Sequence, residues 1–289
     1  MQTISIDTAS TSRPTRSATT VIIRPGRGLF DLDLASLWEF REILYFLVWR
    51  DIKLRYKQTA IGAAWAILQP LATMAIFTVI FGHLAKIPSD GLPYAIFSFT
   101  GLLPWTYFSQ AIARSGASVV GDANLIKKVY FPRLLIPIAA VLSPLVDFLI
   151  SFVFLVGMVA WFGVRPGWNM VALPFFLALA MIAALATGLW LSALNVKYRD
   201  VGHTLPFLIQ IWLYASPVAY SVTLIPEKWR LVYGLNPMAG VIEGFRWALL
   251  RTERPALGVI AMSAVVVLAL LIGGVMFFKH LERSFADIV

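Results

Sequence analysis

Six long apolar segments constrain this chain more than any other feature of its sequence. They lie at 61–84, 93–113, 134–162, 171–194, 205–224 and 257–278. At about 1.5 Å of rise per helical residue, each is long enough to cross the roughly 30 Å hydrocarbon core of a bilayer. Charged residues make up only 13% of the chain, well below the usual share in a soluble domain. The sequence therefore predicts an all-α membrane protein with six transmembrane helices.

The distribution of basic residues predicts the orientation. An even number of spans places both termini on the same side of the membrane. With both termini in the cytoplasm, 17 of the 24 Lys and Arg residues fall on the cytoplasmic side and 7 fall outside. Cytoplasmic loops carry an excess of basic residues, so we expect a multi-pass inner-membrane protein with cytoplasmic N and C termini. Five of the seven outside residues lie in the segment 225–256, which therefore weakens the bias.

Two segments precede the first span. Residues 1–35 are rich in Ser, Thr and Arg and lack the apolar core of a signal peptide, so they are predicted to form a cytoplasmic N-terminal arm. Residues 36–57 separate charged from apolar positions at helical spacing and carry Trp38 and Trp49, aromatic residues that favour the headgroup zone. We expect an amphipathic helix in the membrane interface, the alternative being a half-buried helix of a soluble domain. Residues 58–289 then form the six-span domain.

The segment 225–256 contains the start signal of a further helix. Asn236 and Pro237 have the pattern of an N-cap followed by Pro at the first helical position. Apolar residues then recur at helical spacing, whereas Glu243 and Arg246 lie off that face. The pattern predicts an amphipathic or re-entrant helix at the outer surface. Non-helical backbone at membrane depth is tolerated only against protein or a water-filled cavity, so a re-entrant segment here would line something.

The loop 118–133 predicts a short cytoplasmic helix. Asp122 is a candidate N-cap, Leu125 and Ile126 are apolar, and Lys127 and Lys128 turn outward. Such a helix fits a groove on a soluble partner. It equally fits an anchor in anionic lipid, and the residues alone leave both alternatives open.

The sequence excludes an ATP site of the P-loop type. That motif needs a Lys followed by Ser or Thr, and none of the eight lysines is followed by either. A secondary transporter would show repeated halves or several intramembrane ionisable groups. We find no repeat, and the one deep carboxylate is Asp147. Asp147 either relays protons or contacts substrate, or it satisfies a neighbouring helix through Ser143 or Ser151, and we favour the second interpretation.

Aromatic residues inside the spans suit a path for sugars, because aromatic faces stack on sugar rings. The candidates in the first and fifth spans are Trp65, Phe77, Phe81, Trp212, Tyr214 and Tyr220. The alternative is that each of them faces lipid or packs between helices, and for any single residue that alternative is favoured.

Four stretches of the sequence resemble a known family. They read RDIKLRYKQTAIGAAWAILQPL at 50–71, NLIKKVYFPR at 124–133, NVKYRDV at 195–201 and YGLNPMAGVIEGFRWALL at 233–250. In this order and spacing the sequence resembles the membrane permeases of bacterial polysaccharide ABC exporters of the ABC-2 type, which export O-antigen, teichoic acid or capsule. The resemblance covers nearly all of 36–289 and is nearest the O-antigen and teichoic acid branch, without separating the glycans.

The resemblance implies a particular architecture. It implies six spans, an amphipathic interface helix, a cytoplasmic coupling helix and short periplasmic re-entrant helices. It also implies a homodimer in which each permease pairs with a separate ATPase subunit. That subunit would bind ATP and Mg, so the chain itself would be no enzyme and hold no cofactor. The substrate would be a lipid-pyrophosphate-linked polysaccharide moved from cytoplasm to periplasm, with no nucleic acid among the partners.

The resemblance also implies roles for individual residues. Those implied to couple to the ATPase are Asp122, Asn124, Leu125, Ile126, Lys127, Lys128 and Tyr130. Those implied to lie at the interface helix and the lipid headgroups are Arg50, Lys53, Arg55 and Lys57. Those implied to form a periplasmic gate are Asn236, Pro237, Glu243 and Arg246. No role transfers to residues 1–30.

The main hypothesis is therefore a non-catalytic permease for a lipid-linked polysaccharide. One rival is an ABC-2 exporter of drugs or small lipids, and another is a proton-coupled lipid flippase using Asp147. A membrane-embedded glycosyltransferase or lipid-modifying enzyme should cluster acidic or His residues at one membrane face. The histidines His83, His203 and His280 are instead scattered over different segments.

Overall fold

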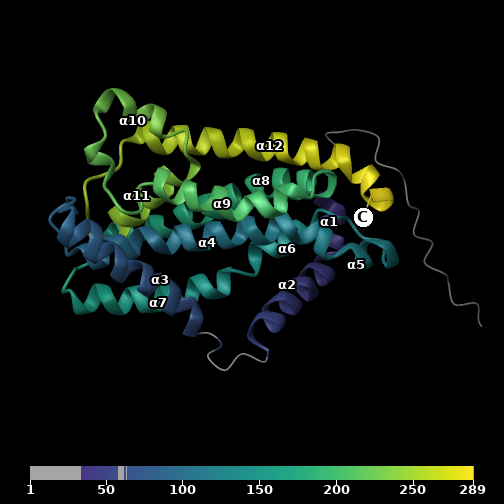
Figure 1. Cartoon of the computed structure of the whole chain (residues 1–289), viewed down its shortest axis with the longest axis horizontal. Coiled ribbons are helices and arrows are strands. Elements are labelled where there is room, and N and C mark those ends of the chain that lie inside the picture. Colours follow the sequence, from purple (N-terminus) through teal and green to yellow (C-terminus); the bar gives the residue numbers. More distant parts are fainter. Residues whose placement is uncertain (1–33, 58–61, 63, 289) are drawn as a thin grey trace, which may run out of the picture.

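The computed structural model describes residues 34–57, 62 and 64–288, and all regular structure in them is helical (Figure 1). The all-α prediction is confirmed. The longer helices are α2 (Arg41–Tyr56), α3 (Ala64–Phe77), α4 (Tyr94–Gly121), α6 (Leu135–Leu142), α7 (Leu145–Trp161), α8 (Leu173–Lys197), α9 (Asp200–Ala215), α11 (Pro237–Leu250) and α12 (Leu257–Ile288). The shorter ones are α1 (Leu34–Glu39), η1 (Thr78–Leu84), α5 (Ala123–Lys128), η2 (Trp168–Ala172), η3 (Val222–Leu224) and α10 (Glu227–Tyr233). Residues 1–33, which hold most of the predicted N-terminal arm, lie outside the described residues.

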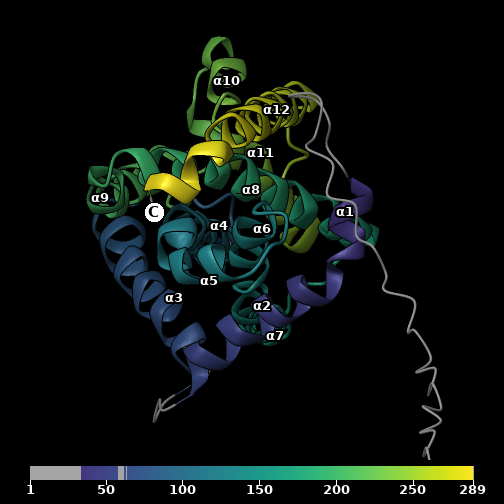
Figure 2. The same cartoon turned by 90° about the vertical axis from the view of Figure 1, so that its right-hand side faces the viewer.

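Helix α4 is the centre of the bundle. Figure 2 shows it nearly end-on, with the other long helices around it. It packs most extensively against α8, and α8 packs in turn against α12. The first half of α4 is buried almost without interruption, from Ile96 to Trp105. Because no polar face of α4 has to reach water there, the bundle can close completely around it.

Four described helical stretches are long and apolar enough to cross a membrane. They are Ala64–Leu84, Leu135–Trp161, Trp168–Lys197 and Leu257–Glu282, at the places of the predicted first, third, fourth and sixth spans. Helix α4 has 28 residues, about 42 Å of helix, but is less apolar. Helix α9 has only 16 residues. The chain therefore has at least four candidate spans by length and composition, and a count of six stays a prediction.

Two prolines set where helices stop. Pro137 and Pro144 both lie in the predicted third span, 134–162, and predict a break near one of them. The break lies at Pro144, between α6 and α7. Pro137 is accommodated in the first turn of α6, where its missing N–H removes no intrahelical bond. The expected fifth span, 205–224, is wrong at its end: α9 stops at Ala215. Ser216 precedes Pro217 and is extended (φ −101°, ψ 150°), because a residue before proline avoids the helical region.

The bundle has two ends, which we name by the short helices they carry. The α5 end carries α1, α5 and the last turns of α12, and the α10 end carries α10 and the connection from α9 to α11 (Figure 1). Helix α2 runs obliquely beside the bundle near the α5 end rather than along its axis (Figures 1 and 2).

The close approach of α4 and α8 depends on Gly188. A Cβ atom at this position would lie 2.4 Å from Ser115 Oγ and 2.6 Å from Ser115 Cβ. Both distances are too short for any real contact, so a side chain here must push the two helices apart.

We therefore expect Gly188→Ala to lower the free energy of unfolding by about 1–3 kcal/mol, as overpacking of a core does. The midpoint of thermal unfolding of the detergent-purified protein measures this. Gly157→Ala in α7 is the matched control, because a Cβ there meets nothing within 4 Å and Ala is the better helix former. Equal midpoints for the two variants would contradict the expectation.

Candidate functional site

Helix α5 projects a polar outer face from the α5 end. Leu125 and Ile126 are half-buried and pack against the apolar cluster formed by α1, α2 and α6. Asn124, Lys127 and Lys128 are exposed, and Tyr130, just past the helix, is 70% exposed. The outward direction predicted for the two lysines is confirmed. The inner face fixes the helix to the bundle and leaves the outer face open to a partner.

The Asp122 side chain joins this helix to α2. Asp122 stands at the N-cap position of α5 as predicted, but its side chain makes no cap hydrogen bond. Both carboxylate oxygens instead accept from the Arg50 guanidinium, each at 2.8 Å, and Arg50 also donates to Asp51. The hydrogen bond to Asp122 is the main reason that the pKa of Arg50 is raised. A bidentate, charge-assisted pair is stronger than a single cap bond to a backbone N–H, which explains the outcome.

Asp147 is held by the same helix, α2. It is buried in α7, pairs with the Arg55 guanidinium and accepts a hydrogen bond from the Tyr56 hydroxyl. Burial, and then the hydrogen bond to Asp147, raise the pKa of Tyr56 to about 12, so the hydroxyl stays protonated and donates. Arg55 also donates to Gln110 Oε1 of α4 at 2.9 Å. Asp147 therefore satisfies a neighbouring helix, as favoured above, but through residues that spacing along the chain did not indicate.

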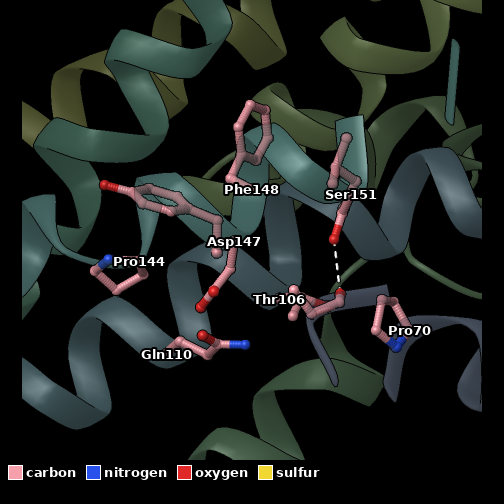
Figure 3. A pocket seen from close by; sticks show the side chains of 10 residues that line it. Pro70, Thr106, Gln110, Pro144, Asp147, Phe148 and Ser151 are labelled. Carbon is pink, nitrogen blue, oxygen red and sulfur yellow. Dashed lines mark hydrogen bonds between the residues drawn. The ribbon is translucent and has the colours of Figure 1, made fainter. Parts of the chain in front are cut away.

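The partners predicted for Asp147 are wrong. Ser151 Oγ donates to the Ala66 carbonyl of α3 at 2.7 Å. Ser143 Oγ accepts from Arg114 and donates to the Ala140 carbonyl. Figure 3 shows Asp147 directed toward Gln110, away from Ser151. A cavity of about 10 Å³ lies beside Asp147, and its lining includes Asp147, Gln110, Ser151 and Thr106. That volume suits one water molecule and excludes a sugar.

Helix α2 is thus fixed at two places by ion pairs. Arg50 ties it to the junction of α4 and α5, and Arg55 ties it to α7. Two of the four residues predicted at the lipid headgroups therefore face protein carboxylates, whereas Lys53 and Lys57 are exposed. The exposed side of α2 also carries large apolar residues, which are Tyr45, Phe46, Trp49 and Leu54. A helix with this outer face is suited to lie against a membrane surface.

Helix α11, at the α10 end, begins as predicted. Asn236 Oδ1 accepts from the Met238 N–H at 3.0 Å, and Pro237 occupies the first turn. The amphipathic interpretation is wrong, because Glu243 and Arg246 are as buried as the apolar residues. The helix packs between α4, α8 and α12, which favours the re-entrant alternative.

The structure accounts for two of the five basic residues in 225–256 that weakened the charge bias, whereas Lys228, Arg251 and Arg254 are exposed. Arg246 Nη1 lies 3.1 Å from Glu243 Oε1 and its side chain is fully buried, so its charge is balanced inside the bundle. Arg230 donates to the carbonyls of Ile225 and Thr223. These two arginines serve the local backbone and are poor markers of topology.

The six aromatic candidates do not share one surface. Phe77 is buried edge-on to Phe81, and Trp212 packs edge-on to Trp105 and Phe108 while donating to Asn236 Oδ1. Tyr220 shares a hydrogen bond of 2.7 Å with Tyr233. Trp65 and Tyr214 are more than half exposed, on α3 and α9. Figure 2 shows these two helices on the same side of the bundle.

Comparison with models of known protein families identifies the family of this chain. The model of the family described as ABC-2 type transporter matches residues 42–250, well over half of the chain. The chain belongs to the ABC-2 type transporter family. The match runs from α2 to the end of α11 and so includes both the ion-paired α2–α5 region and the buried α11.

Individual relatives of this ABC-2 chain carry more specific names. It is 29% identical over 255 residues to the O-antigen export system permease protein RfbA of Myxococcus xanthus, covering 87% of this chain and 97% of the relative. It is 28% identical to an RfbA of Klebsiella pneumoniae, covering 86% and 95%. It is 23% identical to the polysialic acid transport protein KpsM of Escherichia coli, covering 76% and 86%.

The contribution of the Asp147–Arg55 ion pair to the stability of the protein can be tested. Asp147→Asn leaves a partly buried guanidinium without its counter-charge, so we expect the free energy of unfolding to fall by about 1–3 kcal/mol. The double variant Asp147→Asn/Arg55→Gln removes both charges and should recover part of that loss. Chemical denaturation of the purified protein measures both effects.

Asp200→Asn is the control, because Asp200 is an exposed carboxylate at the start of α9. A double variant as unstable as the two single losses added together would show that the two residues are not coupled.

Proposed function

We propose that this chain is the membrane permease of a polysaccharide exporter. Its substrate is a lipid-pyrophosphate-linked, O-antigen-like glycan, which it moves from cytoplasm to periplasm. The observation that carries the proposal is the similarity to two O-antigen export permeases over 86–87% of this chain and at least 95% of theirs. A similarity that spans whole chains favours a shared activity over a shared fragment.

The proposal includes the orientation. The α5 end is the cytoplasmic end, because the excess of Lys and Arg falls there. The α10 end, with α10 and the re-entrant α11, is then periplasmic. The exposed apolar face of α2 lies in the cytoplasmic interface of the membrane.

The energy comes from a separate ATPase subunit docked on α5. Supporting this, α5 presents exposed Lys127 and Lys128 beside the exposed Tyr130 ring, while its inner side is packed on the bundle. A mixed basic and aromatic protrusion suits a groove on a soluble partner. Through the Arg50–Asp122 pair, a displacement of α5 reaches α2, and through Arg55 it reaches α7. We propose this as the path from ATP hydrolysis to the bundle.

Two copies of the chain form the transport path between them. The cavity beside Asp147 has room for about one water molecule and cannot pass a glycan. The side formed by α3 and α9 is apolar and exposed in a single copy, notably at Trp65, Ile76, Phe207 and Tyr214. Together these features support a homodimer in which the α3 and α9 side of each copy is buried against the other copy or lines the transport path.

The rival uses of Asp147 find less support. A proton relay needs a carboxylate that can release its proton to a path, whereas Asp147 is paired with Arg55 and bonded to Tyr56. The names of two of the most similar relatives favour polysaccharide over a drug or small lipid.

The direct test deletes the gene and follows the lipid-linked glycan. We expect the glycan to build up on the cytoplasmic side and surface polysaccharide to fall, with both restored by the gene on a plasmid. Mass spectrometry of extracted lipids and surface staining measure the two. Unchanged surface polysaccharide without any accumulated glycolipid would refute the proposed function.

The docking on α5 predicts a specific loss. Truncating an anchoring aromatic side chain in an interface commonly costs enough to weaken binding about tenfold, so Tyr130→Ala should weaken binding of the ATPase subunit by about that factor. Co-purification and titration of the reconstituted subunits measure it. Tyr45→Ala is the matched control, since Tyr45 on α2 is equally exposed at 70%. If the two variants bind the ATPase subunit equally well, α5 is not the docking site.

A further inference from the structure

The connection after α9 is buried but not helical. Residues 216–221 follow the end of α9, and Ser216 to Ala219 are buried within the protein. Carbonyls outside a helix have no donor on a following helical turn, and a buried carbonyl without a donor is costly. At membrane depth the cost is higher still. The Ser216 carbonyl accepts from the Val218 N–H within the segment at 2.7 Å, and the carbonyls that follow it must find donors on other helices.

Three consecutive carbonyls of this connection accept hydrogen bonds from side chains. Val218 O accepts from Arg246 Nη2 at 2.7 Å, and Tyr220 O accepts from Arg246 Nη1 at 3.0 Å. Ala219 O, between them, accepts from the Tyr94 hydroxyl at the start of α4. Arg246 of α11 and Tyr94 of α4 thus hold these three carbonyls, and Asn236, just before α11, holds the start of the segment by donating from Nδ2 to Ser216 Oγ at 2.9 Å. We call Arg246, Tyr94 and the segment Ser216–Ser221 the outer latch.

Arg246 is itself fixed by several contacts, although its buried Nε has no hydrogen-bond partner among the described residues. Its side chain is fully buried, its charge is met by Glu243 on the preceding turn, and its guanidinium carbon lies 3.6 Å from the centre of the Phe97 ring. The guanidinium fork matches two carbonyls and one carboxylate at once, which a Lys ammonium cannot do. The position therefore requires the planar shape of the Arg246 guanidinium as well as its charge.

Gly101 of α4 leaves the room that Arg246 occupies. A Cβ atom at Gly101 would lie 2.9 Å from Arg246 Nη2 and 3.3 Å from the Val218 carbonyl oxygen. A methyl group there would therefore displace the guanidinium from the carbonyl while leaving Arg246 in the sequence. This gives a way to weaken the latch without removing its charge.

Helix α9, next to the latch, is loosely held. Leu205 is its only buried residue among those described, and Phe207, Leu208, Ile211 and Tyr214 are exposed. Its own helix contributes a bond from Ser216 Oγ to the Trp212 carbonyl at 2.9 Å, so the connection is fixed mainly from α11 and α4. A segment held by a few side-chain bonds at the end of a loosely packed helix can be released as one unit.

We propose that Arg246 is a positioning residue that keeps the α10 end closed. It holds the Ser216–Ser221 segment against α4, and that end opens when the three carbonyls are released together. The identification of this end as the exit of the polysaccharide rests on the proposed function. The latch itself is a property of the chain and can be tested without substrate or ATPase.

The test measures the accessibility of Val218, which is fully buried. The chain contains no cysteine, so Val218→Cys introduces a single thiol. In the purified full chain, the rate of its modification by a water-soluble methanethiosulfonate reports release of the segment. We expect Arg246→Lys and, separately, Gly101→Ala to raise this rate at least about tenfold, as loss of a charge-assisted hydrogen bond shifts a local opening equilibrium.

Ala248→Cys is the matched control. Ala248 is also fully buried in α11 and, two residues from Arg246, points to the opposite side of the helix. A rate that rises at position 218 and stays unchanged at 248 supports the latch. A rate that rises equally at both positions, or at neither, overturns it, because the first means general loosening and the second means that Arg246 holds nothing closed.

Because Arg246→Lys and Gly101→Ala are tested separately, the proposal can still be tested if one of the two variants misfolds. Gly101→Ala keeps Arg246 and Glu243, so its effect does not depend on an unbalanced buried charge. Loss of surface polysaccharide in the gene deletion is a separate readout. If that readout fails while labelling at 218 responds, the proposed function falls and the latch remains. If labelling fails while export depends on the chain, the latch falls and the function remains.

Discussion

Wherever a helix stops inside this bundle, its backbone carbonyls must find donors away from water, and the rest of the structure is arranged around that requirement. At the end of α9 the donors are Arg246 and Tyr94. At the break between α6 and α7, the Tyr107 hydroxyl of α4 donates to the Val141 carbonyl at 3.1 Å. The central helix α4 therefore supplies donors at both breaks. This explains why the Tyr94 and Tyr107 hydroxyls lie on a helix that is otherwise buried largely among apolar residues.

The ion pairs at the α5 end do a different task. The α2 residues Arg50 and Arg55 reach carboxylates on the α4–α5 junction and on α7, and both guanidinium groups keep some contact with solvent. Partly exposed pairs add modest stability, so their value lies in geometry. They make α2 a rigid link between the projecting helix α5 and the bundle. At the opposite end, the fully buried Arg246–Glu243 pair fixes the position of a non-helical connection.

Several features were predictable because they depend on neighbouring residues. The Asn236–Pro237 cap, the break at Pro144 and the outward lysines of α5 follow from local backbone chemistry, and the structure confirms them. The end of α9 was missed although its signal, Pro217, was present, because apolar character continues past it. Asp122 stands at the predicted N-cap of α5, but its side chain bonds Arg50, 72 residues away, because Arg50 offers a stronger partner. The Asp147 partners were wrong for the same reason, since α2 supplies them.

By itself the sequence determined the membrane class, the helical content, the approximate places of the apolar segments and the lack of a P-loop. These depend on hydropathy, helical spacing and motif, all of which are local. Only the tertiary structure decided which polar residues are buried and what they hold. Glu243 and Arg246 fall off the apolar stripe of α11, yet they are buried because α4, α8 and α12 enclose that helix on all sides. Long-range packing, which no spacing along the chain records, turned two apparent surface charges into the support of a buried connection.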